Sequence, residues 1–241
     1  DPAGVRIRTA RGVSIVVDGV NLHRPFFSNA GAPMELEGFT VKRGAGNNGG
    51  GVGANGPLTL TNMVFDANVG TVSGGAVTAG SSLTITSSSF TNNHTLNGNG
   101  GAVMYLGLSG AAGIVNSTFT ANHAVSSDFA QGGGVYNQGD MAVTSSAFTS
   151  NSSQWGGDGV SNAGGMTLTS STFDDNYPNN AVRNGPSASM FIVQSTIKGS
   201  RIGARGVLND GSLKLDGSTV TGNQGGGVLN AAFASVTTVN S

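Results

Sequence analysis

An eight-residue block with a fixed order of apolar and polar side chains recurs nine times, and this repeat restricts the possible folds more than any other feature. Successive blocks begin 19 to 29 residues apart. Repeats at such spacing are typical of solenoids, in which each repeat forms one coil that stacks on its neighbours. The blocks cover residues 15–22, 34–41, 58–65, 83–90, 112–119, 141–148, 166–173, 190–197 and 213–220.

Alternate residues of a block are apolar, as in Leu58 and Leu60, which is the pattern of a β-strand with one buried face. Positions six and eight have the same parity, so we expect both to point inward and to form columns along the solenoid. Position six is serine in six successive blocks, at residues 88, 117, 146, 171, 195 and 218. Position eight is Leu22, Val41, Phe65, Phe90, Phe119, Phe148, Phe173, Ile197 and Val220.

Two asparagine series accompany the blocks. In a stack of parallel strands, equivalent amides can bond to one another across the ~4.8 Å rung spacing, so we interpret both series as structural ladders. The first series follows position eight by three residues, at Asn68, Asn93, Asn122, Asn151, Asn176 and Asn223. The second is Asn137, Asn162, Asn184, Asn209 and Asn230, two residues after the valine of a corner that is often glycine-rich.

These columns predict an all-β fold, a right-handed parallel β-helix of about nine coils that occupies residues 1–241 as a single domain. Regular repeats run from 49 to 230, whereas residues 1–48 are atypical because Leu22 and Val41 replace the phenylalanine. Residues 5–8 are interpreted as the tail of an earlier coil. Val236 is assigned to position three of an unfinished tenth block, so we expect the chain to be a fragment of a longer solenoid.

Two motifs recur in register, Gly-Gly-Ala-Val, as at 74–77 and 100–103, and Phe-x-x-Asn, as at 65–68 and 90–93. Together they resemble the paired repeats of polymorphic outer-membrane proteins, a family of bacterial autotransporter adhesins. The resemblance covers roughly residues 49–230. It implies a β-helix that is secreted and displayed at the bacterial cell surface, for adhesion to a surface glycan or a protein receptor.

Composition narrows the partners further. The net charge is −1 and the chain contains no cysteine, so we expect no nucleic-acid partner, no disulfide and no thiolate chemistry. No stretch approaches the roughly 20 apolar residues of a membrane span. We expect no cofactor.

An enzymatic alternative is a polysaccharide lyase or hydrolase. Residues 44–182 contain no lysine or arginine, so only the C-terminal coils could neutralise the carboxylate of a uronate substrate. A hydrolase needs two carboxylates about 5 to 9.5 Å apart, and adjacent aspartates on an extended strand would face opposite ways. The candidate catalytic residues are Asp174, Asp175, Arg201 and Arg205, but we expect a non-catalytic display, adhesion or fibre module.

Three aromatic residues are the candidate binding site. Phe129, Trp155 and Tyr177 fall in loops after the Phe-x-x-Asn motif of three consecutive coils, so we expect them on one side of the solenoid. Loops on a rigid scaffold commonly carry binding, and aromatic faces suit sugar rings or protein anchors.

Other patterns support weaker hypotheses. His94 and His123 directly follow the motif and should lie one rung apart, but no third ligand accompanies them, so we expect no metal site. A column of outward threonines could order water, but Gly113 and Ala142 interrupt it. Head-to-tail contact with neighbouring copies, which would build a filament, is the remaining alternative.

Overall fold

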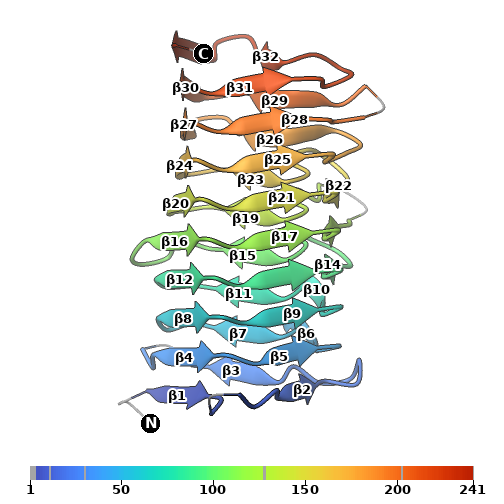
Figure 1. Ribbon diagram of the computed structural model, residues 1–241, viewed down its shortest axis with the longest axis vertical. Coiled ribbons are helices and arrows are strands. Elements are labelled where there is room, and N and C mark those ends of the chain that lie inside the picture. Colours follow the sequence, from blue (N-terminus) through green and yellow to red (C-terminus); the bar gives the residue numbers. More distant parts are fainter. Residues whose placement is uncertain (1–3, 11, 30, 127–128, 202, 241) are drawn as a thin grey trace.

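The computed structural model describes residues 4–10, 12–29, 31–126, 129–201 and 203–240. Their strands stack into a parallel β-solenoid of about nine coils, with the N-terminal coil at one end and the C-terminal coil at the other (Figure 1). No helix occurs in these ranges, and every strand pairing between coils is parallel. The predicted all-β parallel fold is therefore confirmed.

Two long sheets carry the eight-residue blocks of the described chain. Sheet A contains β1 (Val5–Arg8), β4 (Met34–Glu37), β8 (Leu58–Thr61), β12 (Leu83–Thr86), β16 (Ala112–Val115), β20 (Asp140–Thr144), β24 (Gly165–Thr169), β27 (Ser189–Val193), β30 (Ser212–Asp216) and β33 (Ser235–Val239). Sheet B contains β2 (Val16–Asp18), β5 (Thr40–Lys42), β9 (Val64–Asp66), β13 (Ser89–Thr91), β17 (Thr118–Thr120), β21 (Ala147–Thr149), β25 (Thr172–Asp174), β28 (Thr196–Lys198) and β31 (Thr219–Thr221).

Sheet C closes the coils, and a short sheet D adds a further strand to five of the described coils. Sheet C follows the glycine-rich corner and contains β3 (Phe26–Ser28), β7 (Val52–Ala54), β11 (Val77–Ala79), β15 (Val103–Tyr105), β19 (Val135–Asn137), β23 (Val160–Asn162), β26 (Asn180–Asn184), β29 (Arg205–Asn209) and β32 (Val228–Asn230). Sheet D, between B and C, is short: β6 (Ala45–Asn48), β10 (Val69–Ser73), β14 (His94–Thr95), β18 (His123–Ala124) and β22 (Ser152–Ser153).

The core is a set of columns that run along the solenoid. Equivalent block residues are rung partners, such as Leu58 with Leu83 and Phe65 with Phe90, and these side chains are buried. Five phenylalanine rings stack almost parallel, with successive centroids 4.7 to 4.9 Å apart, at residues 65, 90, 119, 148 and 173. The predicted position-eight column therefore exists and fills the interior opposite sheet A's aliphatic residues.

The first asparagine ladder links successive coils beside the phenylalanine stack. Asn93 is representative: its Oδ1 accepts from the backbone and side-chain amides of Asn68, at 3.0 and 2.9 Å. Its Nδ2 donates to Asn122 Oδ1 and to the carbonyl of Phe65, both at 3.0 Å. All of these atoms are buried, so the ladder satisfies polar groups that would otherwise be costly to bury.

The second asparagine series and the serine column form matching ladders. Asn137, Asn162, Asn184 and Asn209 each donate from Nδ2 to the asparagine of the following coil. The serine hydroxyls accept from the backbone amide one coil earlier, as Ser117 Oγ does from Ser88 N at 3.2 Å. Both sets are buried, which confirms that these polar residues face inward.

The bends between sheets do not depend on glycine alone. In most coils the backbone is left-handed at block position five, as at Ser87 and Ser145, and again just before the ladder asparagine, as at Ala121. The glycine corner has a different requirement, because a Cβ on Gly101 would lie 2.2 Å from the carbonyl oxygen of Gly133 in the next coil. Such an approach of two backbones admits no side chain.

The first and last blocks were predicted in the wrong register. Val17, not Leu22, is the rung partner of Val41, and Leu22 is 73% exposed. Residues 5–8 form β1 in register with β4, so they begin the first coil, whose two strands are separated by a longer turn than the repeat predicts. Likewise Val236 pairs with Leu213 and therefore occupies position one of the last rung.

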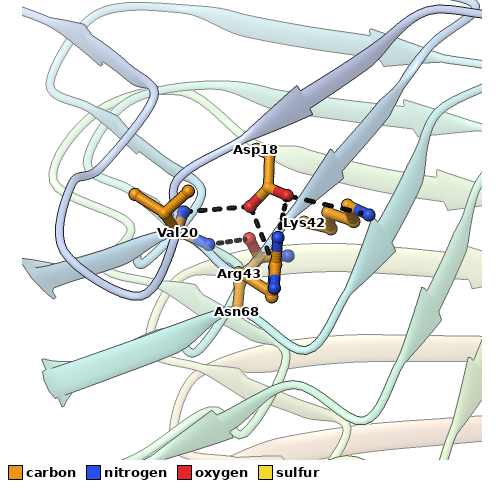
Figure 2. A network of polar contacts seen from close by, with 6 residues as sticks. Asp18, Val20, Lys42, Arg43 and Asn68 are labelled. Atoms are coloured by element: carbon orange, nitrogen blue, oxygen red, sulfur yellow. Dashed lines mark hydrogen bonds and ion pairs between the residues drawn. The ribbon is translucent and has the colours of Figure 1, made fainter.

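An ion cluster takes the place of the amide ladder in the first coil (Figure 2). Asp18, at the end of β2, accepts from the backbone amide of Val20 at 2.9 Å and from Arg43 Nε at 3.0 Å, and Lys42 Nζ lies 3.7 Å away. The hydrogen bond from Arg43, helped by that from Val20, lowers the pKa of Asp18 to about 2. Asn68 supplies the last ladder contact here, by accepting from Gly44 N.

The first ladder is interrupted at Ser200, which occupies the asparagine position after Ile197. The Ser200 hydroxyl is buried and has no hydrogen-bond partner among the described residues, while its amide still donates to Asn223 Oδ1.

Ser200→Asn should therefore add amide contacts to Asn176 and Asn223 and raise the free energy of unfolding by about 1 kcal/mol. Chemical denaturation measures this, with Asn122→Ser as the matched reverse change, expected to destabilise. A Ser200→Asn protein less stable than the wild type would contradict the ladder argument.

Candidate functional site

The three predicted aromatic residues lie in loops of consecutive coils. The Phe129 and Trp155 rings are in contact, with centroids 4.8 Å apart and planes tilted by 47°. They remain 62% and 51% exposed, an unusual arrangement for large apolar side chains that touch each other. Tyr177, 36% exposed, has a different neighbour, because the Arg201 guanidinium lies 6.0 Å from its ring centroid. We call these three residues the aromatic corner.

A buried carboxylate joins the two loops that carry Trp155 and Tyr177. Asp158 Oδ1 accepts from Ser153 N at 2.8 Å and Ser153 Oγ at 2.7 Å, which fixes the ends of the Trp155 loop. Asp158 Oδ2 accepts from Asn179 N at 2.7 Å, two residues after Tyr177. Asn179 Nδ2 also donates to the carbonyl of Ser153, so both loops are held against one anchor.

The carboxyl group of Asp158 is fully buried, and its hydrogen-bond donors are neutral. Burial raises the pKa of Asp158 to about 6, although the hydrogen bonds from Ser153 and Asn179 act in the opposite direction. The group therefore changes charge within the range of mildly acidic solutions. This is the one strongly raised carboxyl pKa among the described residues, and it lies directly beneath the aromatic corner.

Three of the four predicted catalytic residues lie at one junction between coils. Lys198 Nζ lies 3.4 Å from Asp174, and Arg201 pairs with Asp175 across the same junction. Asp175 has a φ of 55°, so it is a left-handed turn residue, and the two adjacent aspartates do not share one extended strand. Arg205 lies apart, on β29, opposite Asn180.

These ion pairs occur where two of the side-chain columns are interrupted. The phenylalanine stack ends at Phe173 and the first amide ladder is broken at Ser200, both at this junction. A third ion pair, Arg183 with Asp210 at 2.9 Å, crosses the same pair of coils. Asp174, Asp175 and Arg201 therefore help to hold the two coils together, whatever further role they have.

The two histidines are rung partners in sheet D, His94 on β14 and His123 on β18, as their spacing predicted. Partial burial lowers the pKa of both imidazoles, so both are mainly neutral near pH 7. His123 Nδ1 is within hydrogen-bonding reach of Ser152 Oγ on the following rung. Within the described ranges, no group of three or more His, Cys, Asp or Glu side chains is placed to hold a metal ion.

Comparisons with protein-family models, with curated proteins and with solved structures found no match to this chain. The class that the structure itself defines is a parallel β-solenoid with amide ladders and a phenylalanine stack. The described part of the chain contains no helix that is long and apolar enough to span a membrane.

Sequence reasoning anticipated the aromatic corner but not the carboxylate that supports it. The position of Asp158, five residues after Ser153 in a loop with two glycines, is a signal that could have suggested an anchor. The contact between Tyr177 and Arg201 could not be predicted from the repeat pattern, because the loops that carry these residues differ from coil to coil.

The free energy of unfolding should fall as the pH is raised from about 4 to about 6. The folded protein binds the Asp158 proton more tightly than the unfolded chain, whose carboxyl titrates near 3.8, so this stabilisation is complete below that value and is lost through the folded-state pKa. The loss is on the order of 3 kcal/mol. Trp155 is the sole tryptophan, so its fluorescence during denaturation reports the change.

Asp158→Asn is the control for this pH dependence, because the amide cannot ionise. The difference in stability between wild type and variant should change between about pH 4 and about pH 6 and level off above that range. A difference that stays constant from pH 4 to 7 would mean that another group is responsible.

Proposed function

We propose that this chain is a non-catalytic module, displayed outside the cell or on a bacterial surface, that holds a partner at the aromatic corner. The observation that carries the proposal is the exposed contact between Phe129 and Trp155 on loops fixed by a buried anchor. Exposed aromatic rings on a rigid support lose little conformational freedom on binding, which favours affinity.

The motifs support the same proposal. The recurrence of Gly-Gly-Ala-Val with Phe-x-x-Asn resembles the repeats of polymorphic outer-membrane adhesins, and display for adhesion is the function that this resemblance implies. The partner would be a surface glycan or a protein receptor. Gln131 and Gln154 flank the two rings in the sequence, and each side-chain carbonyl accepts a hydrogen bond from the protein, so their orientation is fixed. Aromatic faces beside amide groups suit an uncharged partner.

The alternative of a polysaccharide lyase or hydrolase has less support. The candidate carboxylates Asp174 and Asp175 each have a cationic partner from the next coil, so neither stands as a free acid or base. Arg205 does not join them. A structural part for these residues accounts for the same contacts without catalysis.

Trp155→Ala should weaken binding on an array of glycans, polysaccharides and purified extracellular proteins by tenfold or more, because the ring presents the larger apolar face of the pair. Phe129→Ala should act in the same direction. Leu108→Ala is the matched control, since Leu108 is an exposed apolar residue, at 77%, on a different loop. Release of reducing or unsaturated sugar ends would overturn the non-catalytic proposal, as would equal binding by wild type and Trp155→Ala.

A further inference from the structure

Sheet A carries a hollow on its outer face, whereas the aromatic corner lies on loops that lead into sheet C. The hollow has a volume of about 450 Å³, within the range of small-molecule sites, and spans β16 to β30. The turn before β16 projects beyond its neighbours at this edge of the sheet (Figure 1). We call this feature the sheet A hollow.

The hollow exists because the outward threonine column is interrupted. Position two is threonine at Thr59 and Thr84, but Gly113 and Ala142 occupy the next two rungs, so the surface drops there. The next residues in the column, Thr167 and then Phe191, have larger side chains. Side chains on one face of successive parallel strands stand side by side, so a run of small residues followed by a ring makes a floor with a wall.

The Phe191 ring has one face available to a ligand. Lys214, on the following rung, places its Nζ 4.6 Å from the ring centroid and covers the face on that side. On the other side the rung partner is Thr167, whose side chain is shorter than a phenylalanine ring, so the outer part of that face is left open above Thr167 and Ala142. A flat apolar ring with one open face is a surface on which a pyranose ring can stack.

The polar groups of the hollow suit sugar hydroxyls. Asp140, on β20, leans over Gly165, where an added Cβ would lie 2.4 Å from Asp140 Oδ1, so the missing side chain makes room for the carboxylate. Ser189 and Ser212 continue the same column. In the residues that the structure describes, neither Asp140 nor Lys214 takes part in an ion pair, and with one charge of each sign the lining has no net charge.

We infer that the sheet A hollow binds an uncharged oligosaccharide of hexopyranose units, independently of the aromatic corner. Asp140 and Phe191 lie two rungs apart, roughly 10 Å along the axis at the usual strand spacing, which is enough for two or three sugar units. One ring stacks on the open face of Phe191. The sugar hydroxyls form hydrogen bonds with the side chains of Asp140, Thr167, Ser189 and Ser212.

The methionines provide a direct readout. Met141, Met166 and Met190, at block position one, lie directly beneath the hollow with their side chains buried in the core, and the other three methionines, Met34, Met63 and Met104, lie outside it. With methyl-labelled methionine, an NMR titration with uncharged trisaccharides of glucose, galactose, mannose and N-acetylglucosamine should shift the first three signals and leave the others in place. Trigalacturonate serves as the charged comparison.

Variants then locate the binding. Ala142→Ile keeps a good strand residue and fills the floor, and Phe191→Thr restores the threonine of the column and removes the wall. Each should weaken binding of the trisaccharide tenfold or more. Thr84→Ile, in the same column outside the hollow, and Trp155→Ala, at the aromatic corner, should leave it unchanged.

Each contrary result has a definite meaning. No shift of the three methionine signals with any uncharged trisaccharide would overturn the inference, and so would tighter binding of trigalacturonate. Shifts that persist in Ala142→Ile would place the sugar elsewhere. Loss of trisaccharide binding in Trp155→Ala would assign that binding to the aromatic corner. If instead the array shows no effect of Trp155→Ala, the proposal for the aromatic corner fails and the inference about the sheet A hollow stands.

Discussion

Hydrogen bonding between equivalent side-chain amides of successive coils is the constraint on which this solenoid depends. In the unbroken part of the first ladder, a buried asparagine accepts from one neighbouring coil and donates to the other, so its polar atoms are satisfied only when the coils are in register. A slip of one residue would leave these amides unpaired and would turn Phe119 and its neighbours toward solvent. The ladder therefore fixes register while the loops between blocks vary in length.

This separation of register from loop length explains where binding groups can appear. Insertions fall at the corners, and the aromatic corner is made from such loops, with Asp158 supplying the anchor that the repeat itself lacks. The face of sheet A offers the other opportunity, because an outward side chain can change without disturbing the core. Phe191 and Lys214 occupy positions where the preceding coils have threonine, glycine or alanine.

The columns inside the solenoid could be predicted because they repeat. Phe90, Ser117 and Asn122 recur at constant offsets, and parity alone shows which way they point. Features that occur once could not be predicted this way. The first coil was misplaced because a longer turn separates its two strands, and the two-residue strands of sheet D are too short for a periodic signal. The hollow was visible only as a fault in the threonine column.

The junction at Ser200 also differs from the rest in how it would respond to its surroundings. Elsewhere in the regular coils, stacked rings and buried amides hold neighbours together, and dissolved ions have little effect on either. Here the ring stack and the first ladder end, and the pairs of Lys198 with Asp174 and of Arg201 with Asp175, both near solvent, supplement the serine column and the second asparagine ladder, which continue across the junction. Ionic strength screens such pairs. Concentrated salt would therefore weaken this plane of the rod more than the planes between the other regular coils.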